Sequence, residues 1–148
     1  MKPEIMRYKN DSISFYMAII GLALDAVFLI ALYSNPPIAL KDKFGLIFGT
    51  DTIYNIVFML IAFYTAEKVK TYALNWCYVS GAMGILQLPR ILLCTSLASA
   101  EQLNGFRLVF CILLLVFSAI ALIVGAFTSY FKSKKLHAYL NQLEKEVA

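Results

Sequence analysis

Charge is scarce in this sequence. Only 15% of its 148 residues are Asp, Glu, Lys or Arg, whereas 61% are hydrophobic. Soluble domains have about a quarter charged residues and about half apolar ones. The shortage of charge therefore excludes an ordinary water-soluble globule, and the abundance of apolar residues excludes a disordered chain. A chain of this length also has no room for a separate catalytic domain beside a membrane part.

Reactive side chains are equally few. The chain has one His and three Cys, and Cys77, Cys94 and Cys111 form no CxxC pair. A metal site needs a set of His, Cys or carboxylate ligands, and an enzyme of a known motif class needs a phosphate loop, an HExxH pair or a nucleophile elbow. None of these patterns is present, so we expect a protein that is not an enzyme and has no metal and no cofactor. Basic and aromatic residues form no surface outside the apolar stretches, which argues against a nucleic-acid partner.

Four long apolar stretches are what the sequence does have. A helix needs about 20 mostly apolar residues to cross about 30 Å of hydrocarbon. The predicted spans cover residues 13–33, 52–66, 72–98 and 106–131, and the short second span is expected to borrow apolar residues before Asp51. The sequence thus predicts an all-α integral membrane protein. Its four transmembrane helices would form a bundle of two hairpins within residues 1–131.

Two segments outside the spans are amphipathic. The loop at 34–51 is rich in apolar residues, so we expect it either to lie in the outer headgroup region or to contact a partner. The tail at 132–148 has Leu136, Leu140 and Leu143 at helical spacing, which predicts a cytosolic amphipathic C-terminal helix. That helix would lie on the membrane or pack on a cytosolic partner, and a fluctuating tail is the alternative.

The Lys and Arg residues near the span ends predict the orientation. Cytoplasmic segments of membrane proteins are enriched in these residues. One side of the membrane would carry only Lys41, Lys43 and Arg107, while Arg90 lies inside a span. The other side would carry the remaining Lys and Arg residues: Lys2, Arg7, Lys9, Lys68, Lys70, Lys132, Lys134, Lys135 and Lys145. We therefore expect a multi-pass protein of the plasma or cytoplasmic membrane with both termini in the cytoplasm.

Two ionisable residues and one amide inside the spans are the candidate site. A charge within a bilayer costs at least about 2.5 kcal/mol, so Asp25 and Arg90 need a reason to be there. The rise of 1.5 Å per helical residue places them at similar depth, and Gln87 lies one turn before Arg90. We expect the three side chains to face each other. They would form a structural clasp, a substrate or proton pathway, or a contact with a charge of another subunit.

Other residues have more general roles. Small residues allow helices to approach closely in lipid, and we assign this packing role to Gly21, Ser80, Gly84, Ala121 and Gly125. The basic cluster of Lys132, Lys134 and Lys135 is assigned to topology or to contact with anionic lipid headgroups.

The preferred interpretation is a small, non-enzymatic integral membrane subunit. It would pack against and stabilise a larger membrane complex, such as a transporter, through a protein partner within the bilayer. The alternative is a minimal transporter or channel that works as a homo-oligomer and uses Asp25, Gln87 and Arg90 in its pathway.

Overall fold

The computed structural model describes residues 3–6, 9–33, 46–92 and 105–147. Within these ranges the regular elements are α1 (Pro3–Met6), α2 (Ser12–Tyr33), α4 (Leu46–Lys70), α5 (Leu74–Ile85) and α7 (Gly105–Val147). Residues 87–92 form a further helical segment after α5, and no strand occurs in these ranges. The all-α expectation is therefore confirmed here. Cys94 and most of the predicted 34–51 loop lie outside the described residues, and the rest of that loop belongs to α4.

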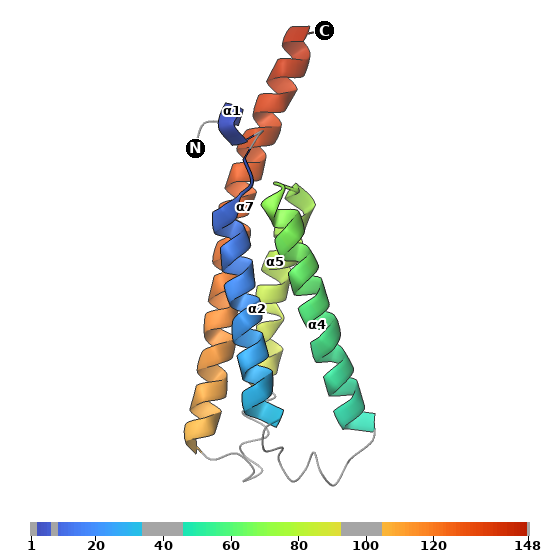
Figure 1. Cartoon of the computed structure of the whole chain (residues 1–148), viewed down its shortest axis with the longest axis vertical. Helices are drawn as coiled ribbons and strands as arrows, with labels where there is room; N and C mark the ends of the chain where they lie inside the picture. Colours follow the sequence, from blue (N-terminus) through green and yellow to red (C-terminus); the bar gives the residue numbers. More distant parts are fainter. Residues whose placement is uncertain (1–2, 7–8, 34–45, 93–104, 148) are drawn as a thin grey trace.

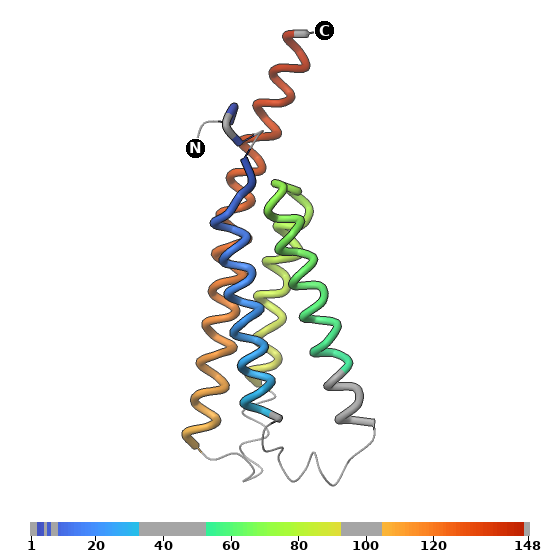
Figure 2. Tube along the Cα trace, in the orientation of Figure 1, coloured from blue at the N-terminus to red at the C-terminus, as the bar shows by residue number. Residues whose placement is uncertain are grey.

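The long helices lie alongside one another, and consecutive ones run in opposite directions (Figure 1). Helix α2 packs against α7 and α4, and α5 packs against the same two helices. In the described ranges the long helices therefore alternate in direction, as they do in up-down-up-down helix bundles. Figure 2 shows that the coloured part of α4 diverges from the other helices with increasing distance from its turn to α5.

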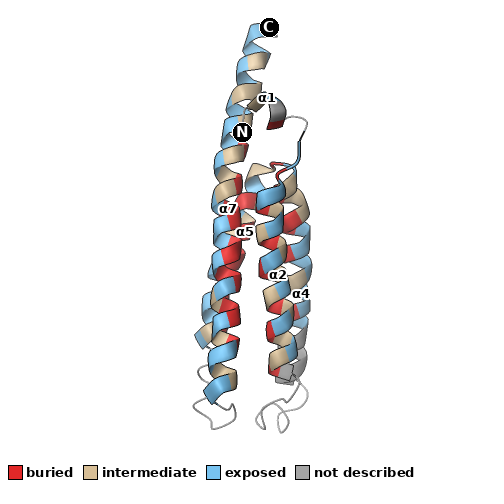
Figure 3. Cartoon of the chain, turned by 60° about the vertical axis from the view of Figure 1, so that its left-hand side comes forward, coloured by how far each residue is buried: buried red, intermediate tan, exposed pale blue. Residues whose placement is uncertain are grey.

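Each helix buries a narrow stripe of residues. In α2 the buried positions are spaced alternately by four and three residues, which is the spacing of bundles with left-handed, coiled-coil-like packing. The stripe comprises Ser14, Ala18, Gly21, Asp25, Phe28 and Leu32. Helix α7 has a similar stripe, which comprises Cys111, Leu115, Ser118, Leu122, Gly125, Ser129 and Ser133. Figure 3 shows these buried stripes running along helices whose outer sides are exposed.

The exposed sides of the helices are strongly apolar. Ile30 is 70% exposed, Leu60 64% and Phe117 56%, and many other large apolar side chains are similarly open. Two helical stretches, Ser12–Leu32 and Gly105–Glu146, are long and apolar enough to cross a membrane. Soluble monomers rarely expose such continuous apolar surface, which agrees with the membrane association expected from composition.

Helix α7 differs from the expected span followed by a separate tail helix. It is one helix of 43 residues from Gly105 to Val147, which corresponds to a length of about 64 Å. The sequence between Phe131 and Val147 contains no Gly or Pro, so nothing interrupts the backbone where the composition becomes polar. The last part of α7 therefore projects beyond the other helices (Figure 1), and α1 packs on it with Met6 buried.

The third predicted span contains a break. Helix α5 ends at Ile85, Leu86 is its C-cap, and residues 87–92 are helical again. Pro89 explains this break, because it has no N–H to donate to the carbonyl of Ile85 and its ring crowds that carbonyl. The break lies next to Gln87 and Arg90, the residues singled out in the sequence.

The turn between α4 and α5 is tight. Tyr72 has a left-handed backbone with φ of 58°. Its N–H donates to the carbonyl of Val69 at 3.1 Å, and the N–H of Ala73 donates to the carbonyl of Lys68 at 3.3 Å. This is a Schellman motif, and it ends α4 and reverses the chain within three residues.

Candidate functional site

The candidate site is a group of buried polar side chains in the middle of the bundle. We call Asp25, Asn55, Gln87, Arg90 and Ser118 the central polar cluster. Asp25 comes from α2, Asn55 from α4, Gln87 and Arg90 from the segment after α5, and Ser118 from α7. All five are buried, so α2, α4, α7 and the helical segment after α5 each contribute polar groups to one interior site.

The three residues expected to meet are in direct contact. The Nη1 of Arg90 lies 3.0 Å from Oδ1 of Asp25, and Nε2 of Gln87 donates to Oδ2 of the same carboxylate at 2.8 Å. Arg90 Nη1 also donates to Oε1 of Gln87 at 2.7 Å. Gln87 thus donates to the anion and accepts from the cation, which fixes the geometry of the pair.

Two further residues complete the hydrogen bonding. Asn55 Oδ1 accepts from Nη2 of Arg90 at 2.8 Å. Ser118 Oγ accepts from Gln87 Nε2 at 3.0 Å and donates to the backbone oxygen of Gly21 at 3.0 Å. These contacts extend the network from the ion pair to α4 and to α7.

Aromatic rings surround the guanidinium of Arg90. Its Cζ atom lies 4.9 Å from the ring centroid of Phe28 and 5.1 Å from that of Phe58. A cation over an aromatic face is stabilised by the ring quadrupole, most strongly where water is excluded. The two rings therefore stabilise the Arg90 charge and shield it from the outside of the bundle.

The central polar cluster is closed and electrically balanced. Asp25 is 1% exposed, Gln87 0% and Arg90 6%, and the two formal charges cancel. Across the part of the chain that the structure describes, no buried side-chain N or O atom lacks a hydrogen-bond partner. A network satisfied in this way holds the helices in one arrangement. It leaves no carboxylate oxygen of Asp25 without a donor.

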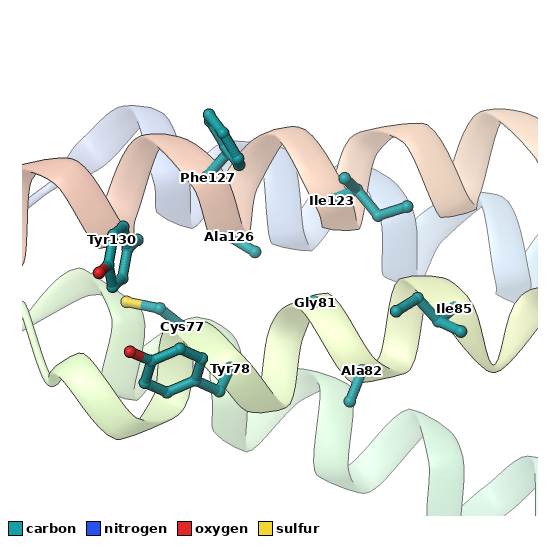
Figure 4. Close-up of a pocket in the computed structure, with 9 residues that line it drawn as sticks. All are labelled: Cys77, Tyr78, Gly81, Ala82, Ile85, Ile123, Ala126, Phe127 and Tyr130. Carbon is teal, nitrogen blue, oxygen red and sulfur yellow. The ribbon is translucent and has the colours of Figure 1, made fainter.

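Two apolar grooves lie on the surface of the bundle, and neither is lined by Asp25, Gln87 or Arg90. One, of about 500 Å³, lies between α5 and α7 (Figure 4). The other, of about 310 Å³, lies between α4 and α5. Phe58, whose ring lies against the Arg90 guanidinium, also lines this second groove.

A second polar group ties the start of α2 to two other helices. Asp11 is the N-cap of α2, and its Oδ1 accepts the N–H of Ser14 at 3.3 Å. The same carboxylate pairs with Nζ of Lys132 on α7 at 2.6 Å, and the Asp11 N–H donates to the carbonyl of Lys70 at 2.9 Å. Ser14 Oγ also lies 3.0 Å from Oγ1 of Thr128. We call Asp11, Ser14, Thr128 and Lys132 the N-cap cluster.

The residues assigned to helix packing lie at helix contacts. A Cβ at Gly84 would lie 2.6 Å from Cγ1 of Ile123 on α7. A Cβ at Gly21 would lie 2.9 Å from Cγ of Leu122, and the hydroxyl of Ser80 donates to the Leu122 carbonyl at 3.2 Å. A Cβ at Gly125 would lie 3.2 Å from Cβ of Met17 on α2, and Ala121 is buried.

The three lysines assigned to topology or lipid contact differ in their surroundings. Lys132 is paired with the buried Asp11, whereas Lys134 and Lys135 are exposed on α7. Lys132 therefore contributes to the packing of α2 on α7 as well as to the basic character of this end.

The sequence interpretation missed Asn55, Ser118 and Asp11. Asn55 precedes Phe58 by three residues, and Phe58 precedes Ala62 by four. This helical spacing predicts that Asn55 lies on the inner face of α4. The Asp11-Ser12 pair directly before an apolar run is an N-cap signal. Ser118 carried no comparable signal, because small residues in such a helix usually mark close packing alone.

No family model, curated protein or solved structure matches this chain. Within the described ranges no group of three or more His, Cys, Asp or Glu residues could hold a metal ion. A functional proposal therefore rests on the residues and contacts given above.

Proposed function

We propose that this protein is a non-enzymatic, four-span membrane subunit that packs against and stabilises a larger membrane complex, such as a transporter. In this proposal α2, α4, α5 with residues 87–92, and the first part of α7 cross the bilayer. Both termini lie in the cytoplasm, and the end of α7 extends into it. The central polar cluster acts as a clasp that holds the helices together.

One observation carries the proposal. The ionisable groups in the middle of the bundle are paired with each other, while the long helices expose many large apolar side chains on their outer faces. A charge inside a bilayer is tolerated when it is paired within the bundle. The surface that remains available for interaction in the membrane is then the apolar outer face, which suits lateral packing against another membrane protein.

The first test is affinity purification of the tagged chain from native membranes in a mild detergent. The proposal expects a stoichiometric second polypeptide, identified by mass spectrometry. A matched purification of an unrelated tagged four-span protein removes polypeptides that bind any apolar surface. Recovery of the chain alone, as a defined oligomer, would contradict the proposal and favour the homo-oligomeric transporter or channel.

A second measurement separates the clasp from a pathway. Under the clasp, Asp25→Asn lowers the amount of folded protein and lowers complex formation in proportion. Under the pathway, the same variant accumulates normally as an oligomer but no longer supports flux of a substrate in reconstituted vesicles. Normal abundance of Asp25→Asn would therefore argue against the clasp.

A further inference from the structure

The groove between α5 and α7 has a small-residue floor and larger side chains along its edges (Figure 4). Gly81 and Ala126 meet at the floor, where a Cβ at Gly81 would lie 3.7 Å from the Cβ of Ala126. Phe127 and Tyr78 are exposed at the edges, by 64% and 60%. The result is an apolar groove of about 500 Å³ on the outside of the bundle.

The two ends of this groove differ in polarity. The phenolic oxygens of Tyr78 and Tyr130 lie together at one end, where their ring centroids are 5.8 Å apart. Ile85 and Ile123 form the other end, and the oxygens point away from it (Figure 4). The groove thus changes from hydroxyl-bearing to purely aliphatic along its length. A molecule with a polar head and a hydrocarbon chain has the same polarity.

A positive charge lies just beyond the tyrosine end. Lys134 is exposed and follows Tyr130 by four residues and Phe127 by seven, so the three lie on one stripe of α7. Lys134 lies about 6 Å further along the helix axis than Tyr130. Lys135 is equally exposed but is turned by about 100° around the helix from Lys134. Only Lys134 of these two continues the line of the groove.

We propose that this groove binds one anionic phospholipid of the cytoplasmic leaflet. One acyl chain lies over Gly81 and Ala126, and the headgroup lies beside the two tyrosine hydroxyls and Lys134. Phenolic hydroxyls can donate hydrogen bonds to phosphate oxygens, and a lysine contributes a point charge that favours an anionic headgroup over a zwitterionic one. The site rests on the proposed membrane placement but requires no protein partner.

The test is native mass spectrometry of the purified chain in non-ionic detergent with added phosphatidylglycerol or phosphatidylcholine. One phosphatidylglycerol is expected to remain bound per chain, at lower lipid concentration than phosphatidylcholine requires. Lys134→Gln should weaken retention of phosphatidylglycerol about fivefold, the factor that corresponds to one lysine near an anionic lipid. Lys135→Gln is the matched control and should retain the lipid as the wild type does.

Blocking the groove provides a second, independent arm. Gly81→Leu places a side chain in the groove, and the same substitution at Gly105, where a Cβ would meet nothing within 4 Å, is its control. Ile85→Trp, at an exposed position that lines the groove, is a second block in case the first variant does not fold. Both blocked variants are expected to lose the bound lipid, and Gly105→Leu is expected to keep it.

Three outcomes would overturn the lipid site. The first is equal retention of the two lipids by the wild type, and the second is normal retention of phosphatidylglycerol by both blocked variants. The third is that Gly81→Leu loses a co-purifying polypeptide but retains phosphatidylglycerol as the wild type does. That result would mean that a helix of a partner protein occupies the groove. Recovery of the chain from the soluble fraction without detergent would instead overturn the membrane placement itself.

Discussion

At the scale of single residues, each side chain of the central polar cluster has at least one hydrogen-bond partner, and Arg90 has three. Gln87 is the pivotal member because it donates to Asp25 and accepts from Arg90. An amide can reverse these roles by rotating half a turn, since its oxygen and nitrogen are nearly equal in size. If the two charges exchanged positions, Gln87 could therefore still hydrogen-bond to both of them after its amide rotated.

This reversibility gives a first prediction. Asp25→Asn leaves the Arg90 charge buried without its counter-ion, and the loss should lower the free energy of unfolding by about 3 kcal/mol or more. Arg90→Asp alone should be at least as harmful, because it places two carboxylates together. The exchange Asp25→Arg with Arg90→Asp should recover part of the loss, with Gln87 and Asn55 rotating their amides. Thermal melting followed by size-exclusion chromatography measures all three variants.

A matched control is available within the same helix. Ile20→Ala removes an exposed side chain of α2 that lies 48% open, and it should change the melting temperature little. If the double variant Asp25→Arg with Arg90→Asp melts no higher than Arg90→Asp alone, the two charges do not act as a pair.

A second prediction concerns two glycines three residues apart in α5. A Cβ at Gly84 would lie 2.6 Å from Cγ1 of Ile123 and 3.1 Å from the backbone oxygen of Ala119. Gly84→Ala should therefore push α5 from α7 and destabilise the bundle by about 1–3 kcal/mol. Gly81→Ala meets only Ala126 at 3.7 Å and should stabilise the helix by about 0.5–1 kcal/mol. Melting temperatures that change in the same direction for both variants would contradict this packing.

At the scale of elements, the N-cap cluster connects the start of α2 with the end of α4 and the middle of α7. Asp11 has two separable roles, since it caps α2 and pairs with Lys132. Asp11→Ala removes both and should cost about 1–2 kcal/mol, as measured for other caps. Asp11→Asn keeps a capping oxygen and should cost less. Denaturant or thermal unfolding in detergent measures the difference.

The ion pair can be tested by itself. Lys132→Gln removes the counter-ion of a carboxylate that is 1% exposed, so it should cost about 1–3 kcal/mol, whereas Lys135→Gln at a neighbouring exposed position should cost nothing measurable. Equal melting temperatures for Lys132→Gln and Lys135→Gln would contradict a contribution of the Asp11–Lys132 pair to stability.

The sequence predicted which residues form helices better than it predicted how the helices contact and continue into one another. Asp25, Gln87 and Arg90 were predictable neighbours because helical rise alone fixes their depth in the predicted spans. Ser118 was not predicted, because the depth of a residue says nothing about the rotation of its helix about its axis. Asn55 was not predicted either, although its spacing to Phe58 and Ala62 marks the inner face of α4. The continuity of α7 was also missed, since hydropathy reports a change of surroundings after Phe131 and not a change in the backbone.

At the scale of the whole molecule, the proposed topology has a direct test. In a background with Cys77, Cys94 and Cys111 replaced by Ala, single cysteines are introduced at Gly105 and at Lys135. A membrane-impermeant maleimide should label Gly105→Cys on intact cells, and should label Lys135→Cys only after the membrane is permeabilised. Labelling of Lys135→Cys on intact cells would reverse the orientation and would place both termini outside.

Helix α7 joins the bundle to the space beyond it without a hinge between Gly105 and Val147. From Lys132 to Val147 it extends about 22 Å past the level at which Lys132 contacts α2. A tilt of about 10°, small against the range that membrane helices adopt, would move the tip by about 4 Å. The helix therefore acts as a stiff lever arm. A shift of Leu115 or Leu122 within the bundle would therefore move the tip of α7 by a larger distance, and a contact at that tip would receive it as a mechanical displacement.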